Sequence, residues 1–224
     1  MDPTDFTTRG FALIQEVLTA DECEAVVQQL ATVRANPAGT RCLLSQAWCQ
    51  ALAKKIRQHP GLSPLVPFDF VATQCTYFQK SLARNWLVPL HQDLSIPVAR
   101  RITHESLSGW SEKEGTWYVQ PPVELLRQLV AVRLHIDPCG ANDGPLRVVP
   151  ASHLSGRLPE KLATAVRQTE AEFICTAGLG SAMVMRPLLL HASSKSSGNN
   201  RRRVLHFLFG PGGLPFGLQW QYEV

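Results

Sequence analysis

A histidine and an aspartate separated by one residue are the first side chains in the chain that could do chemistry together. His91 and Asp93 lie in the segment 90–94, LHQDL. On an extended strand, residues two apart point to the same face, so both side chains can reach one ion. A neutral imidazole and a carboxylate suit a borderline transition metal. The pair therefore predicts a metal site that needs a third ligand from elsewhere in the chain.

His191 is the best candidate for that third ligand. It ends an apolar run at 183–190 and precedes a polar loop. Two histidines and one carboxylate on one face of a metal leave three coordination positions open, which is the facial triad of non-haem iron(II) oxygenases. His-x-Asp pairs also arise by chance, however, and His135 and Asp137 form a second one in this chain. The residues that accompany each pair have to separate them.

An arginine after the third ligand favours the first pair. Arg202 begins an expected strand in which Val204, His206 and Leu208 share its side. The distal carboxylate of 2-oxoglutarate, buried beside a metal, needs a rigid bidentate cation, and arginine supplies one. A metalloenzyme that does not use 2-oxoglutarate has no need of such an anchor. The combination therefore favours an oxygenase that takes 2-oxoglutarate.

The elements that must position these residues are helices followed by many short strands. Helices are expected at about 20–34, where Thr19 and Glu22 form a capping box, and at 45–58 and 159–170. Strand-like runs separated by turn residues are expected at 10–14, 69–80, 86–98, 129–137, 145–149, 172–175, 180–190 and 202–209. This pattern predicts a mainly β fold with flanking helices, built as a sandwich or barrel.

The segment 99–122 has weak periodicity and is expected to be an irregular functional loop or lid. It carries two tryptophans, Trp110 and Trp117, among the basic residues Arg100, Arg101 and Lys113. These side chains would suit an anionic substrate with an apolar part. The alternative, that they only pack or solvate the loop, stays equally open.

Composition and charge set wider limits. The 224 residues fit one domain, and 45% apolar with 18% charged residues is typical of a globular protein. The net charge of +4 comes without a long basic stripe, and no segment approaches the roughly 18 apolar residues of a membrane span, so we expect neither a nucleic-acid nor a membrane partner. Six scattered cysteines and the lack of a signal peptide predict free thiols and a cytoplasmic protein. Oligomeric state is not readable.

Five segments with characteristic residues extend over nearly the whole chain. They are GFALIQEVLTADEC at 10–23, HQD at 91–93, AVRLHIDPCGANDGPLRVVPASHLSG at 131–156, GLGSAMVMRPLLLHAS at 178–193 and RRRVLHFLF at 201–209. Together they resemble the phytanoyl-CoA dioxygenase family of iron(II)- and 2-oxoglutarate-dependent oxygenases. The resemblance implies a double-stranded β-helix, that is, a cupin-like jelly roll. It divides the single domain 1–224 into a helical N-terminal part, about 1–65, and a jelly-roll core, about 66–210.

The resemblance also implies roles for individual residues. His91, Asp93 and His191 match the metal ligands, and iron(II), 2-oxoglutarate and dioxygen would be the cofactor and cosubstrates. Ser193 and Arg202 match the pair that binds the distal carboxylate of 2-oxoglutarate, with Gln92 and Lys80 also near the cosubstrate. Arg201 and Arg203 flank Arg202 and leave room for a slip of one residue. The substrate pocket would use Arg100, Trp110 and Trp117, and also Arg133, which stands where some relatives have an aromatic residue.

The reaction implied is hydroxylation of an unactivated carbon of a small molecule, with release of succinate and carbon dioxide. Related halogenases replace the carboxylate ligand by a small residue, and the presence of Asp93 argues against that chemistry here. Two other readings remain: a cupin-type metalloenzyme that does not use 2-oxoglutarate, and an inactive binding module on the same fold.

Overall fold

The chain is described by a computed structural model that covers residues 3–33 and 39–224. The helices are α1 (Pro3–Arg9), α2 (Ala20–Ala31), α3 (Ala47–Arg57), α4 (Val123–Gln128) and α5 (Glu160–Thr169), with two short 3-10 turns at Leu43–Ser45 and Ser152–Ser155. The strands are β1 (Phe11–Ile14), β2 (Gly39–Thr40), β3 (Phe70–Lys80), β4 (Val88–His91), β5 (Ile96–Val98), β6 (Ser108–Lys113), β7 (Thr116–Gln120), β8 (Val130–His135), β9 (Leu146–Val148), β10 (Phe173–Cys175), β11 (Ala182–Met185), β12 (His191–Ser193) and β13 (Arg202–Pro211).

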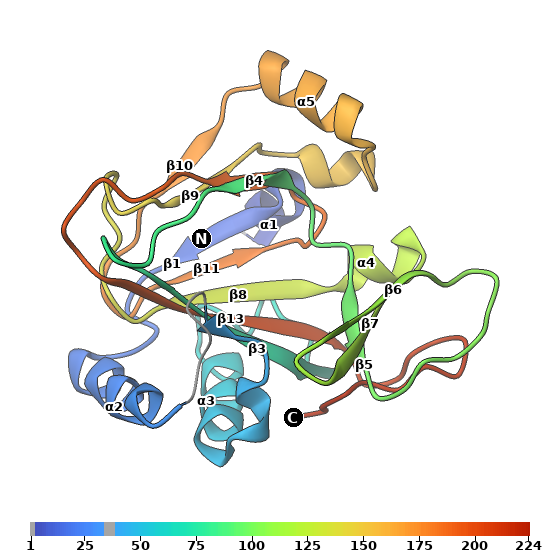
Figure 1. Ribbon diagram of the computed structural model, residues 1–224, viewed down its shortest axis with the longest axis horizontal. Helices are drawn as coiled ribbons and strands as arrows, with labels where there is room; N and C mark the ends of the chain where they lie inside the picture. The colour runs from blue at the N-terminus through green and yellow to red at the C-terminus, as the bar shows by residue number, and fades with distance from the viewer. Residues whose placement is uncertain (1–2, 34–38) are drawn as a thin grey trace.

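Two antiparallel sheets form the body of the molecule. The larger has six strands in the order β1-β11-β8-β13-β3-β2, and the smaller has four in the order β10-β9-β12-β4. In Figure 1 the smaller sheet lies above the larger one, with α5 above it and α2 and α3 below the larger sheet. Strands that are distant in sequence are neighbours in both sheets, as in a jelly roll. The predicted mainly β jelly roll with flanking helices is confirmed.

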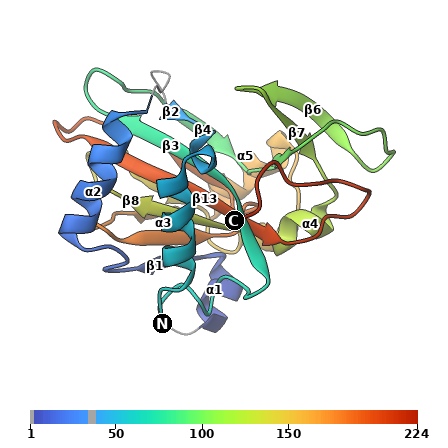
Figure 2. The same ribbon diagram turned by 90° about the horizontal axis from the view of Figure 1, so that it is seen from below.

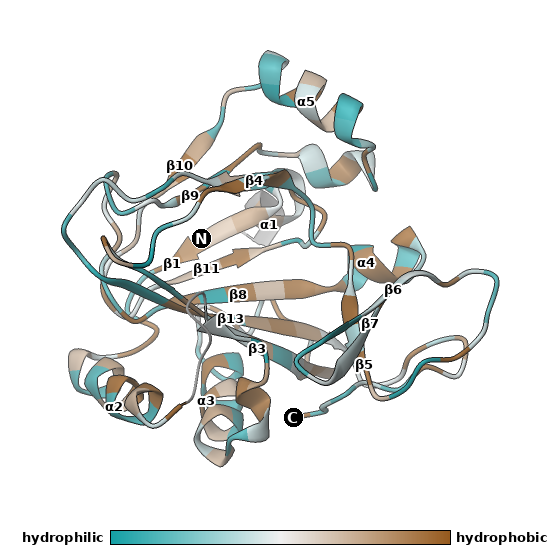
Figure 3. Cartoon of the chain, in the orientation of Figure 1, coloured by the Kyte–Doolittle hydropathy of each residue, from teal (hydrophilic) through white to brown (hydrophobic). Residues whose placement is uncertain are grey.

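Alternating side chains give the larger sheet two different faces. On β8, Val130, Val132 and Leu134 belong to the core cluster that includes the buried residues of α2 and α3. The intervening residues, among them Ala131 and Arg133, point between the two sheets. Figure 2 shows α2 and α3 lying across the outer face, and Figure 3 shows the mostly apolar colouring of β1, β8 and β11 in the same sheet. Because the helices cover one face, the other face is left to build a cavity.

Helix α2 begins where the sequence predicts. Thr19 and Glu22 form the expected capping box, in which the Glu22 backbone N–H donates to the Thr19 hydroxyl and the Thr19 backbone N–H donates to the Glu22 carboxylate. The helix ends at Ala31, whereas the prediction continued to residue 34, which lies outside the described residues.

The segment 99–122 is only partly the irregular loop that its weak periodicity predicted, because residues 99–107 lack helix and strand but residues 108–120 form a hairpin. Strands β6 and β7 form a hairpin, and β5 pairs with β7 to complete a three-stranded sheet. Glu114 and Gly115 occupy the turn with positive φ angles of 52° and 75°. The period-two signal was weak because β6 is mostly solvent-exposed and therefore carries few apolar residues.

The run expected as one strand at 86–98 is two strands, β4 and β5, in different sheets. The chain leaves β4 after His91, where the Asp93 backbone N–H donates to the Pro187 carbonyl, 2.9 Å away, and not to a neighbouring strand. Asp93 therefore lies just beyond the strand on which the sequence placed it. The backbone hydrogen bond to Pro187 holds Asp93 in this position.

We propose that the described residues form one domain, because the buried residues of α2 and α3 share a core cluster with the larger sheet. The strands β1 and β2, from the helical N-terminal part, are members of that sheet. Within the described ranges, no helix combines the length and the apolar character needed to cross a membrane.

Candidate active site

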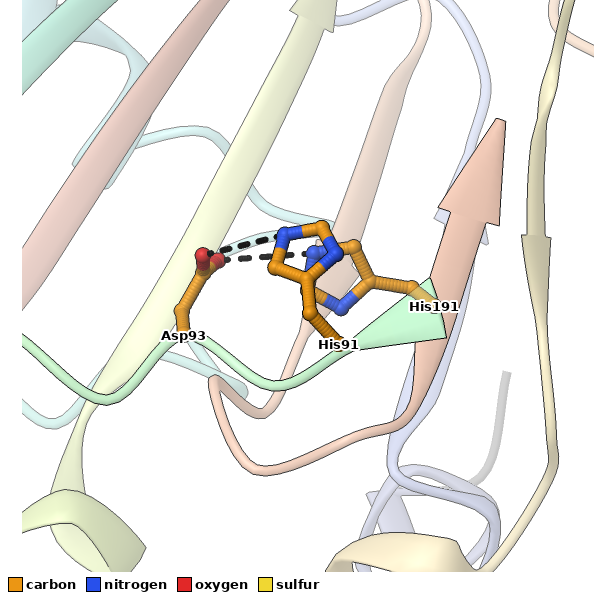
Figure 4. A group of neighbouring side chains, drawn as sticks. All are labelled: His91, Asp93 and His191. Atoms are coloured by element: carbon orange, nitrogen blue, oxygen red, sulfur yellow. Dashed lines mark ion pairs between the residues drawn. The ribbon is translucent and has the colours of Figure 1, made fainter. Parts of the chain in front are cut away.

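Three potential metal ligands meet between the two sheets. His91 and His191 are paired residues on the neighbouring strands β4 and β12, and their rings lie 4.1 Å apart between centroids. The Asp93 carboxylate faces both, with oxygens 3.7 Å from the Nε2 atom of each histidine (Figure 4). One ligand atom from each residue lies within 4.8 Å of the other two. A single ion between them could therefore touch all three.

Backbone hydrogen bonds orient both imidazoles toward that point. The Nδ1 atom of His91 lies 2.8 Å from the Pro89 carbonyl, and that of His191 lies 2.8 Å from the Leu189 carbonyl. A carbonyl only accepts, so Nδ1 must carry the proton in each ring. The lone pair is then on Nε2, which faces the carboxylate. This is the arrangement by which proteins hold metal-binding histidines in the correct tautomer.

The charge states of His191 and Asp93 also suit a metal. Burial lowers the pKa of His191 to about 4, so its ring is neutral at physiological pH. Burial by itself would raise the pKa of Asp93, but the nearby histidines, His191 first, outweigh it and hold that pKa below its usual range. A neutral imidazole and an ionised carboxylate are the forms that bind a divalent ion.

A cluster of buried cations lies at one end of the same cavity. Arg202 and Lys80 are opposite each other on β13 and β3, so their side chains share the inner face of the sheet. Both are buried, with exposed fractions of 3% and 0%. The Lys80 ammonium donates to the Ser193 hydroxyl (2.7 Å) and the Ser194 carbonyl (2.8 Å). Arg202 and Ser193 line the cavity directly. Lys80 does not line it, but its ammonium is hydrogen-bonded to the Ser193 side chain that does.

Arg133 adds a third positive charge. It lines the cavity from β8, and its guanidinium carbon lies 5.7 Å from the centroid of the Phe78 ring. Burial and then the charge of Arg202 lower its pKa to about 10. The same two causes, with Arg133, lower the pKa of Lys80 to about 7. Within the described part of the chain, none of these three cations forms an ion pair with a carboxylate, so their charges are not compensated by an acidic side chain.

Arg202 itself keeps hydrogen-bonding capacity free. Its Nη1 donates to the Gly144 carbonyl, while its buried Nε atom has no partner. Arg203, by contrast, points the other way and binds Asp137, and Arg201 is exposed. Of the three adjacent arginines, the structure therefore brings Arg202 to the cavity.

Gln92 lines the cavity, yet its amide is committed to the backbone. Its Nε2 donates to the carbonyls of Gly156 and Leu188, and its Oε1 accepts from the Leu158 N–H. The residue between the two ligands thus ties their loop to the neighbouring segments. The resemblance implied that Gln92 contacts the cosubstrate. For such a contact the side chain has only the second lone pair of Oε1 left.

The cavity has a volume of about 570 Å³, within the range of small-molecule sites, roughly 300–1,000 Å³. It brings together the three ligand residues with Ser193, Arg202 and Arg133. Arg100, Trp110 and Trp117, expected in the substrate pocket, are not among the residues that line it. The two tryptophans contact each other edge to face, and Arg101 lies over both. They belong to the packing of the three-stranded sheet, because they lie on its side away from the cavity.

Sequence reasoning left several wall residues unassigned. The inner face of β3 contributes Gln74, Thr76 and Phe78 at the alternating positions that end in Lys80. His206, which shares the side of Arg202 on β13, lines the cavity beside the triad, with Nε2 3.8 Å from an Asp93 oxygen and Nδ1 without a partner among the described residues. The period of two along β3 and β13 was the signal that could have found them.

A family model for phytanoyl-CoA dioxygenase (PhyH) matches residues 6–204. The chain belongs to the PhyH family. The resemblance seen in the five sequence segments is thereby confirmed over most of the chain. A comparison with curated proteins finds no significant match.

Solved structures share the fold of this PhyH-family chain at low sequence identity. The non-haem α-ketoglutarate-dependent epimerase SnoN from nogalamycin biosynthesis has a TM-score of 0.68 at 14% identity, covering 96% of this chain and 84% of SnoN. The carbocyclase SnoK from the same biosynthesis has a TM-score of 0.60 at 13% identity, covering 96% and 87%. HygX from Streptomyces hygroscopicus, with nickel, 2-oxoglutarate and hygromycin B bound, has a TM-score of 0.63 at 18% identity, covering 92% and 84%. These likenesses establish the fold of the PhyH-family chain.

Proposed function

We propose that the chain is an iron(II)- and 2-oxoglutarate-dependent dioxygenase that hydroxylates an unactivated carbon of a small-molecule substrate. One observation carries the proposal: a set of two histidines and a carboxylate faces the same cavity as a buried cation cluster that has no acidic partner among the described residues. The first is a donor set for iron(II), and the second suits the distal carboxylate of a dicarboxylate. Membership of the PhyH family supports the combination.

In this proposal the Nε2 atoms of His91 and His191 and the carboxylate of Asp93 hold the metal. Bound iron(II) would supply the oxidative decarboxylation of 2-oxoglutarate to succinate and carbon dioxide, coupled to oxidation of the substrate. The presence of a carboxylate ligand at Asp93, where halogenases have a small residue, favours hydroxylation as the outcome.

The cation cluster would hold and orient the cosubstrate. Arg202 has an unpartnered Nε and a planar guanidinium that suits a carboxylate. The Ser193 hydroxyl accepts from Lys80 and is therefore free to donate its own proton to the same carboxylate. We assign Lys80 and Gln92 to positioning, the first behind Ser193 and the second within the loop of the metal ligands.

The neighbours of this fold catalyse different reactions, since SnoN is named an epimerase and SnoK a carbocyclase. All such outcomes require the same bound metal and cosubstrate, so the first test addresses binding. Iron(II) is added to the protein without oxygen, 2-oxoglutarate is titrated, and a weak visible charge-transfer band is expected. The band should disappear in His91→Ala, weaken in Arg202→Ala and persist in the exposed control Arg100→Ala.

Hydroxylation itself is tested by product analysis. With a substrate found by screening, each succinate released should be matched by one oxygen atom from ¹⁸O₂ in the organic product. Metal binding without a band would instead favour a cupin-type metalloenzyme that does not use 2-oxoglutarate. Binding of neither metal nor 2-oxoglutarate would favour an inactive binding module.

We also propose that the protein works in the reducing cytoplasm. All six cysteines are free thiols in the structure, and most are buried as small apolar residues. Titration of thiols in freshly extracted protein should find six per chain, and a disulfide in that material would contradict this placement.

A further inference from the structure

The cavity has a second group of cations at its mouth, far less buried than the first. Arg41 and Lys113 both line the cavity. The Arg41 side chain is 41% exposed and Lys113 is half-buried, whereas Arg202 and Lys80 are enclosed. One cavity therefore carries an enclosed and a more exposed group of cations, and the metal ligands line the same cavity.

The tip of the β6–β7 hairpin brings these two mouth residues together. Glu114, in the hairpin turn, accepts from the Thr40 hydroxyl (2.5 Å) and from the Arg41 backbone N–H (3.0 Å). This contact joins the hairpin to the segment after β2. Lys113, next to Glu114, is thereby held close to Arg41, although the two are far apart in sequence.

The mouth keeps a net positive charge after this contact. Glu114 also pairs with the Arg41 guanidinium, at 3.6 Å, so this carboxylate compensates Arg41 and, among the described residues, leaves the charge of Lys113 unpaired. Lys113 forms no ion pair within the described ranges, and its ammonium lies 4.9 Å from the centroid of the buried Tyr118 ring. Burial and then the charge of Arg41 lower the pKa of Lys113, while Asp93 of the metal site opposes that shift. Two like charges are thus held in mutual proximity and within electrostatic reach of the metal site.

The same cavity also has apolar walls. Trp86 and Leu87 line the cavity from the loop before β4, and Leu208 lines it from β13. Leu87 is 57% exposed, which leaves an apolar side chain at the entrance. A ligand that satisfies both features is an amphipathic anion, with its charge between Arg41 and Lys113 and its apolar part along these walls.

We propose that Arg41 and Lys113 form a substrate-binding subsite for a carboxylate or phosphate group, so that the substrate is an amphipathic organic anion. This inference rests on the proposed function, because it assigns the inner cations to 2-oxoglutarate and the outer pair to the substrate. Of the basic residues expected to meet an anionic substrate, it keeps Lys113, and it replaces Arg100 and Arg101 by Arg41, because the structure places Arg41 and Lys113 on the cavity wall.

The test uses matched acids and neutral analogues with the inner site already filled. Octanoate, 3-phenylpropanoate and phenyl phosphate, with octanamide and 3-phenylpropanamide, are titrated into protein holding iron(II) and saturating 2-oxoglutarate without oxygen. Heat of binding and change of the charge-transfer band are recorded. At least one acid should bind, and its amide about tenfold or more weakly, because the amide lacks the charge that Arg41 and Lys113 pair with.

Charge variants then locate the binding. In the double variant Arg41→Gln/Lys113→Gln, acid affinity should fall about tenfold or more, while the affinity for 2-oxoglutarate stays within about twofold. Arg100→Gln removes one nearby surface charge without touching the cavity and should change neither affinity. Lys113→Arg keeps the charge and should retain acid binding.

Three outcomes would overturn the subsite: no acid binds, the amides bind as tightly as the acids, or the double variant binds acids as well as the wild type. These are separable from failure of the proposed function, which is read from 2-oxoglutarate. If the wild type does not bind 2-oxoglutarate, the proposed function fails, and calorimetry of the acids with wild type and double variant still decides the subsite.

Discussion

The chain contains two His-x-Asp segments at the ends of strands, and the fold gives them opposite surroundings. At 91–93, both side chains face the cavity, where His191 of the neighbouring strand completes a triad. At 135–137, Asp137 turns to Arg203, whose guanidinium and backbone N–H both bind it, at 2.6 to 2.8 Å. The same three-residue pattern thus yields a candidate metal site in one place and a structural ion pair in the other.

The difference comes from which face of β13 each segment meets. Arg202 and Arg203 are adjacent, so their side chains leave the strand in opposite directions. Arg203 compensates Asp137, and Arg202 enters the cavity, where no described carboxylate pairs with it. An acid that is already neutralised by arginine has little capacity for a metal. A carboxylate that faces two histidines remains able to bind a metal.

Removal of the Asp93 carboxylate should have the largest effect. In Asp93→Ala the charge-transfer band and succinate release should fall at least about a thousandfold, because a metal ligand and its charge are lost. Anaerobic titration and turnover assays measure this. Asp137→Ala is the matched control and should keep the band; full turnover in Asp93→Ala would remove this residue from the ligand set.

The second aspartate should matter for stability. Asp137→Ala leaves the Arg203 guanidinium, only 15% exposed, without its partner, and should lower the free energy of unfolding by about 2–3 kcal/mol. Urea unfolding followed by circular dichroism measures the loss. If the variant instead loses iron binding while remaining folded and equally stable, the contrast between the two segments is wrong.

The adjacent arginines should separate binding from stability. Arg202→Lys should weaken 2-oxoglutarate binding about tenfold, since a lysine cannot offer a planar two-point contact to a carboxylate. Arg203→Lys should leave that affinity unchanged and cost stability through Asp137. Equal affinities for 2-oxoglutarate in Arg202→Lys and wild type would show that the anchor lies elsewhere.

The smallest effect should be on the pH dependence of cosubstrate affinity. Burial first, and then Arg202, lower the pKa of Lys80 to about 7, so the ammonium is charged below that pH and neutral above it. A bound anion favours the charged form and raises this pKa, so binding takes up a proton above pH 7. The affinity for 2-oxoglutarate should therefore fall a few-fold per pH unit as the pH rises above about 7.

Calorimetry at pH 6 to 9 measures this dependence. Lys80→Met should flatten it and bind at every pH as weakly as the wild type does at high pH. An unchanged slope in Lys80→Met would assign the titration to another group.

Sequence patterns predicted the elements that depend on short-range interactions. The capping box at Thr19, the strand over 70–80 and the helix over 160–169 lie close to where periodicity and capping placed them. The pairing of His91, Asp93 and His191 was also proposed from residue type and local spacing. The hairpin at 108–120 was missed, because an exposed strand has little apolar alternation to read.

What the sequence determined by itself was therefore the residue types, the strand periods and hence which side chains share a face. Only the tertiary structure decided which of two His-x-Asp segments meets a third ligand and which of three arginines is buried in a cavity. It also decided that Lys113, and not Arg100, reaches the cavity wall beside Arg41. The physical reason is that local hydrogen bonds and side-chain periods extend over a few residues, whereas the charge around a group is set by strands paired across the sheet.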